Sequence, residues 1–157
     1  MAFTLWKFVH LIGVIIFLGN ISTGFFWKAH AEKYRDQRIL MSAFEGIYLS
    51  DRWITNTCVV IIILSGIMMA YVTDLALLTQ GWVIASFVVF LLAGAFYSKG
   101  IIPLNRKIIA HLAQEKPFGD QEWQEYERMR KPWFLMGLAA TATPFLVLAI
   151  MFFKPQI

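Results

Sequence analysis

An apolar stretch near the start of the chain, from Phe3 to Trp27, constrains the fold most strongly. As a helix it rises about 1.5 Å per residue, which is enough to cross a hydrocarbon core about 30 Å thick. Three further apolar stretches follow, at about 53–73, 82–98 and 133–153. The sequence therefore predicts an all-α fold, a four-helix transmembrane bundle.

The composition agrees with a single integral membrane domain over residues 1–157. Hydrophobic residues make up 59% of the chain and charged residues 15%, whereas soluble domains carry about 25% charged residues. The first apolar stretch exceeds the length of a signal-peptide core, so we expect it to be retained. Cys58 is the single cysteine, which excludes a disulfide or a cysteine metal site within one chain.

Basic residues predict the orientation in the membrane. Two long polar connectors, 28–52 and 99–131, hold 12 of the 14 Lys and Arg residues, and the short connector 74–80 holds none. Basic connectors stay in the cytoplasm and meet anionic lipid headgroups. We therefore predict a multi-pass protein of a bacterial inner membrane, with both termini outside and no nucleic-acid partner.

The connectors carry an amphipathic pattern. In the first, apolar residues recur at spacings of three and four, from Ile39 to Tyr48. Such a pattern predicts a helix with one apolar face, which we expect to lie along the membrane interface. The fold class is thus a four-span bundle with amphipathic cytoplasmic connectors.

One face of the first span is polar or small. At 100° per residue, an arc of about 140° collects Lys7, His10, Gly13, Phe17, Asn20 and Gly24. Polar groups in hydrocarbon are costly, so this face should point into the bundle. In the second span Asn56 lies on a face of small residues, and we predict that Asn20 bonds across to Asn56 or Thr57.

His10 is the leading candidate ligand for a metal. A neutral imidazole binds iron or copper, and His30 and His111 lie too far away in depth to join it. The second ligand would be Met68, Met69 or Met151, or the His10 of another copy across a dimer axis, and five-coordinate iron without a second protein ligand is a further option. Lys7, one turn away, could pair with a haem propionate or extend to the headgroups. The alternative role for His10 is a hydrogen bond to a neighbouring helix carbonyl.

Three segments carry a family resemblance: HLIGVIIFLGN, FWKAHAEKYRD and TPFLVLAIMFFKP. They resemble the bacterial integral-membrane family called domain of unknown function 2269. More distantly, a His followed by Gly early in the first span is similar to the copper-resistance D-type proteins and to the small four-helix membrane protoporphyrinogen oxidases. The oxidase resemblance implies haem b, with His10 as an axial ligand. That pattern also has a Lys inside the third span, where this chain has Lys99 at the cytoplasmic end.

These observations predict a small membrane protein that binds haem b for redox chemistry or haem handling. Copper handling is one alternative. Another is a non-enzymatic accessory or scaffold subunit that packs against a larger membrane complex or forms a homodimer. Enzymatic activity stays open, and no hydrolase or phosphate-binding motif is visible in the sequence.

Overall fold

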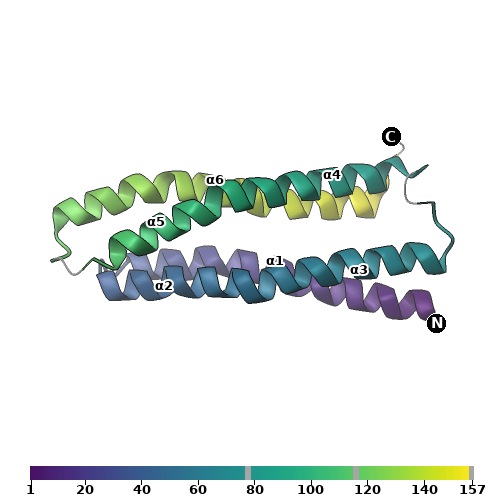
Figure 1. Cartoon of the computed structure of the whole chain (residues 1–157), viewed down its shortest axis with the longest axis horizontal. Helices are drawn as coiled ribbons and strands as arrows, with labels where there is room; N and C mark the ends of the chain where they lie inside the picture. The colour runs from purple at the N-terminus through teal and green to yellow at the C-terminus, as the bar shows by residue number, and fades with distance from the viewer. Residues whose placement is uncertain (77–78, 115–116, 156–157) are drawn as a thin grey trace.

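The computed structural model describes residues 1–76, 79–114 and 117–155, and every regular element within them is a helix. These helices form four long rods, which lie side by side in Figure 1. The first is α1 (Ala2–Glu32), and the last is α6 (Asp120–Phe153). The second joins α2 (Gln37–Ser50), the π-helical turn η1 (Asp51–Thr55) and α3 (Asn56–Val72); the third joins α4 (Gly81–Phe96), the π-helical turn η3 (Tyr97–Ile101) and α5 (Ile102–Leu112). The prediction of an all-α bundle with four membrane-spanning helices is confirmed.

Each rod is longer than a bilayer is thick. The four rods have 31, 36, 32 and 34 residues, or about 46 to 54 Å, against a hydrocarbon core of about 30 Å. Both termini lie at one end of the bundle, and α2, α5 and the start of α6 form the other end (Figure 1). We call the latter the polar end, because it contains the two long basic connectors.

The prediction of a separate helix along the membrane interface is wrong. Instead, α2 continues into α3 through η1, and the two helices share one direction (Figure 1). The chain offers no glycine or proline between Ser50 and Asn56 to stop the helix. Its start is fixed by Asp36, whose carboxylate caps the backbone N–H groups of Arg38 and Ile39.

In the apolar half of the bundle the rods pack as two pairs, α1 with α3 and α4 with α6. Gly13 permits a close approach in the first pair, since a Cβ there would lie 3.2 Å from both Ile61 and Ile62. Phe17 of α1 meets Phe90 of α4, with 6.2 Å between ring centroids. The predicted inward face of the first span is confirmed at Gly13 and Phe17, which are both buried.

The most completely buried large apolar side chains lie in the polar end, where the two pairs join. Phe44 and Tyr126 are fully buried there, and Phe44 packs edge-on against Trp133 with 5.3 Å between centroids. The rest of this core is apolar: Ala31, Leu40, Ile47, Ile101, Ile108 and Leu112. The long connectors are therefore not loops on the bilayer surface, because their apolar faces close the bundle.

Candidate ligand-binding site

A carboxylate lies inside the bundle at Asp51. Its Oδ1 accepts hydrogen bonds from Thr55 Oγ1 at 3.0 Å and from Asn20 Nδ2 at 3.4 Å. Its Oδ2 accepts one from the Tyr97 hydroxyl at 2.6 Å. The Asn20 amide also donates to Thr55 Oγ1 at 2.9 Å. These four residues, which we call the Asp51 cluster, connect α1, η1 and η3.

Both π-helical turns contribute to the Asp51 cluster. Asp51 is the first residue of η1 and Thr55 its last, and Tyr97 is the first residue of η3. A π-helical turn inserts one extra residue into the helix. Such turns are rare overall, but many of those that occur lie at functional sites. Pro103, which lacks an N–H, lies two residues after the end of η3, in the first turn of α5. The irregular backbone of two helices thus converges on one carboxylate.

The Asp51 cluster forms part of the wall of a central cavity of about 410 Å³. All four rods contribute walls, and most of the lining is apolar or aromatic. Examples from each rod are Phe17, Val59, Phe90, Gly94, Trp133 and Thr141. Ligand sites are commonly cavities of this size, with mainly apolar walls and a few converging polar groups. This cavity has that composition.

No cation neutralises Asp51 within the described residues. Their ion pairs, defined by a nitrogen-to-oxygen distance of at most 4.0 Å, do not include this carboxylate. A carboxylate has about four acceptor positions, and the hydrogen bonds above use three of them. Asp51 can therefore accept one more hydrogen bond and attract a positive charge from the cavity.

His10 makes the helix-to-helix hydrogen bond that was the alternative to metal binding. Its Nδ1 lies 3.0 Å from the carbonyl oxygen of Ile62 and 3.1 Å from Ser65 Oγ on α3. A Cβ on Gly66 would lie 3.7 Å from the imidazole ring, an ordinary van der Waals contact, so His10 packs directly against this part of α3. The carbonyl can only accept, so Nδ1 carries the proton and Nε2 keeps its lone pair. His10 lines neither this cavity nor the groove described below.

The hydrogen bonds of His10 involve Ile62 and Ser65, and the other predicted ligands stay predictions. Met68 and Met69 lie about one turn beyond Ser65 on α3 and are half-buried. Met151 lies on α6, in the other helix pair, and Lys7 is exposed. Among the described residues no three His, Cys, Asp or Glu side chains come close enough to hold a metal ion.

The prediction that Asn20 bonds to the second rod is correct, but the predicted partners, Asn56 and Thr57, are wrong. Asn20 does bond across to the second rod, but to Thr55 and Asp51. Asn56 is exposed, and its amide donates to the carbonyl of Arg52 at 3.1 Å. The π-helical turn changes which residues face α1, so a regular helical wheel selects the wrong neighbour.

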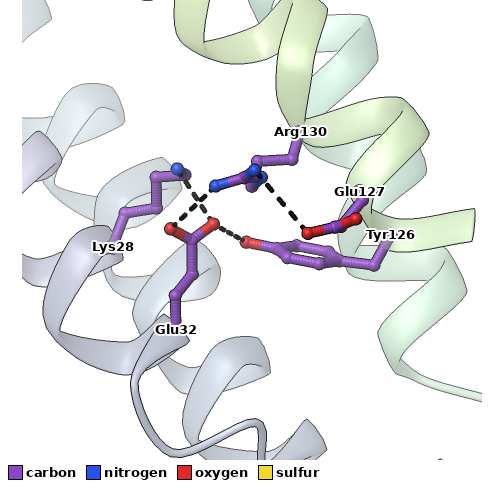
Figure 2. Close-up of polar contacts among 5 residues, drawn as sticks. All are labelled: Lys28, Glu32, Tyr126, Glu127 and Arg130. Carbon is purple, nitrogen blue, oxygen red and sulfur yellow. Dashed lines mark hydrogen bonds and ion pairs between the residues drawn. The ribbon is translucent and has the colours of Figure 1, made fainter. Parts of the chain in front are cut away.

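A second polar network closes the polar end (Figure 2). Glu32 of α1 pairs with Lys28 one turn earlier at 2.9 Å, and Lys28 is only 4% exposed. Glu32 also accepts the Tyr126 hydroxyl at 2.6 Å and lies 3.5 Å from Arg130. Arg130 in turn faces Glu127 at 3.7 Å. This network balances its charges, so we interpret it as structural.

Sequence reasoning missed Asp51 and Tyr97 as site residues. Asp51 was grouped with the hydrated connector 28–52, because it precedes the apolar run that starts at Trp53. In the structure it is level with Asn20, well inside the span 3–27. One feature of the sequence could have identified Asp51 as a site residue. Thr55 follows it by one helical turn, so the two polar side chains lie on the same helical face.

A protein family described as "Predicted integral membrane protein (DUF2269)" matches residues 4–155. Comparison with curated proteins and with solved structures finds no match. The more distant resemblance to copper-resistance and oxidase proteins stays a prediction.

Replacing Glu32 by Gln should destabilise the protein strongly. The change leaves Lys28 buried beside Arg130 without their shared carboxylate, and breaking a buried pair costs about 3–5 kcal/mol. The melting temperature of the detergent-purified protein measures this. Glu45→Gln, an exposed carboxylate on α2, is the matched control and should change it little. Equal melting temperatures for both variants would contradict the structural role of the network.

Proposed function

The chain belongs to the DUF2269 family of predicted integral membrane proteins, and we propose that it binds a small, largely apolar molecule in the central cavity. The head group of this molecule carries a cationic or N–H-bearing nitrogen that contacts Asp51. The observation that carries the proposal is a carboxylate that has three hydrogen-bond donors, has no cation among the described residues and lines a cavity.

The physical argument concerns the cost of the charge. An ionised group inside a membrane bundle is expensive, and such groups usually mark a binding or transport site. Here the donors Asn20, Thr55 and Tyr97 hold the carboxylate in one orientation. A bound cation would gain most from a site in which water is scarce and the partner is already oriented. The apolar walls would then select the body of the ligand.

The test uses phenethylamine and its neutral analogue phenethyl alcohol as probes. Calorimetric titration of the detergent-purified full chain should show the amine binding at least tenfold more tightly, a difference of about 1.4 kcal/mol. Asp51→Asn keeps the shape of the side chain and removes its charge, so it should reduce the difference to less than twofold. Gly94→Leu should weaken both probes, because a Cβ at Gly94 meets open space beside the cavity.

Asp74→Asn is the matched control, an exposed aspartate at the end of α3. It should leave the preference for the amine unchanged. If Asp51→Asn binds the amine as well as the original protein does, or if both probes bind equally, the proposal is wrong.

The haem b prediction is a second candidate function, and one observation favours it. The hydrogen bond from His10 Nδ1 to the Ile62 carbonyl fixes the tautomer in which Nε2 is free to ligate, as in many metal-binding histidines. His10 would supply one axial ligand. Lys7, Met68, Met69 and Met151 stay predicted partners, and copper stays the predicted alternative metal.

Absorption spectra of the purified protein, oxidised and dithionite-reduced, test the haem proposal after expression with adequate haem supply. A Soret band that disappears in His10→Ala and persists in His30→Ala would support it. A spectrum without a Soret band would rule haem out, and metal analysis of the same sample would then decide on copper.

We also propose that the polar end lies in the cytoplasm of a bacterial cell and that both termini lie outside its inner membrane. The distribution of basic residues supports this orientation, and the termini share one end of the bundle.

A membrane-impermeant maleimide tests the orientation in a Cys58→Ser background. In intact cells it should label Lys154→Cys, near the C-terminus, and should label Lys33→Cys, at the polar end, only after lysis. The reverse pattern would overturn this orientation.

A further inference from the structure

A groove of about 620 Å³ runs between α1 and α2, beside the central cavity. It extends from Asn20 to Ala31 along α1, about 16 Å. Its lining changes along this length, because Thr23 and Ile47 lie toward the apolar half and His30 and Arg38 lie toward the polar end. We call it the α1–α2 groove.

The ionisable side chains that line the α1–α2 groove are basic. Arg38 and His30 line it, and none of its described lining residues carries a carboxylate. Asp36 lies two residues before Arg38, but its carboxylate accepts the backbone N–H groups of Arg38 and Ile39 at 2.8 and 3.0 Å. The hydroxyls of Thr23 and Ser42 add polar groups without charge. The lining therefore complements an anion with hydroxyl or ester groups.

The position of the groove indicates a lipid rather than a dissolved ion. Trp27, in its wall, is 57% exposed, and the neighbouring Phe26 is 65% exposed. Aromatic side chains at the end of an apolar span are typical of the headgroup level of a membrane. An anion bound at Arg38 would thus lie at the depth of lipid phosphates, and the lower part of the groove would lie at the depth of acyl chains.

Gly46 leaves the floor of the groove open. A Cβ at Gly46 would meet nothing within 4 Å, and no glycine in the described chain has a positive φ. Glycine inside a helix costs roughly 0.5–1 kcal/mol relative to alanine. The backbone does not require glycine here, so the missing side chain has its clearest effect in keeping the groove empty.

We propose that the α1–α2 groove binds an anionic phospholipid, with its phosphate at Arg38 and His30 and its glycerol backbone near Ser42 and Thr23. The proposed phosphate-binding residues, Arg38 and His30, lie outside the Asp51 cluster. The groove and the central cavity share Asn20, which belongs to that cluster, and Gly24, Ile47 and Ser50 in their walls.

The test measures lipid affinity of the detergent-purified full chain by calorimetry. The probes are dihexanoyl phosphatidylglycerol, the corresponding phosphatidylcholine, and soluble glycerol 3-phosphate. We expect phosphatidylglycerol to bind at least tenfold more tightly than either of the other two. Arg38→Gln should abolish this preference, and Gly46→Leu should weaken phosphatidylglycerol at least tenfold by filling the groove.

Arg128→Gln is the matched control, because it removes an exposed arginine at the polar end outside the groove. It should change the affinity less than twofold. If Arg38→Gln and Arg128→Gln lost affinity for phosphatidylglycerol equally, the lipid would be attracted by the overall positive charge of the protein, and the proposal would be overturned. Equal binding of both lipids would also overturn it, and glycerol 3-phosphate binding as tightly as phosphatidylglycerol would assign the groove to free phosphate.

Discussion

The four rods are longer than the hydrocarbon core, and the structure depends on where the excess length packs. Outside the lipid, burial of apolar side chains is driven by water, so a helix extension with an apolar face gains by meeting another one. α2, α5 and the ends of α1 and α6 bury Phe44, Tyr126 and Trp133 in this way. Inside the lipid that driving force is absent. The rods there pack mainly in pairs, with few contacts between the pairs such as Phe17 on Phe90, and a central cavity lies between them.

The sequence was sufficient for the parts of the fold that follow from local pattern. Apolar length predicted four spans, and the polar arc on the first span identified Gly13, Phe17 and Asn20 as inward-facing residues. It was insufficient wherever two helices must be aligned. The register of α1 against the second rod depends on the turn near Asp36 and on η1, and a regular helical wheel represents neither. For that reason Asn20 was assigned to Asn56 instead of Thr55, and Asp51 was assigned to a connector.

For His10, too, the sequence did not identify the partner on the neighbouring helix. The spacing in the first span correctly predicted a histidine that faces the bundle, and both of its possible roles were open. The structure adds the partner, the Ile62 carbonyl, and thereby the free nitrogen. This geometry serves a structural bond and a metal ligand equally well, because a histidine that ligates a metal also needs its other nitrogen held. The hydrogen bond therefore identifies Nε2 as the atom that would ligate a metal. An absorption spectrum is needed to decide between the structural role and the ligand role.

The surroundings of the two carboxylates inside the bundle explain why we interpret Glu32 as structural and Asp51 as a candidate binding residue. Glu32 and Asp51 both belong to the first helix pair, and each accepts a tyrosine hydroxyl of the second pair at 2.6 Å, from Tyr126 and Tyr97. Glu32 also has Lys28 and Arg130 beside it, so its charge is balanced. Asp51 has hydrogen bonds of similar quality, faces a cavity and has no balancing cation among the described residues. Hydrogen bonds orient a carboxylate but leave its charge in place, and a ligand in the cavity is the group positioned to supply the missing positive charge.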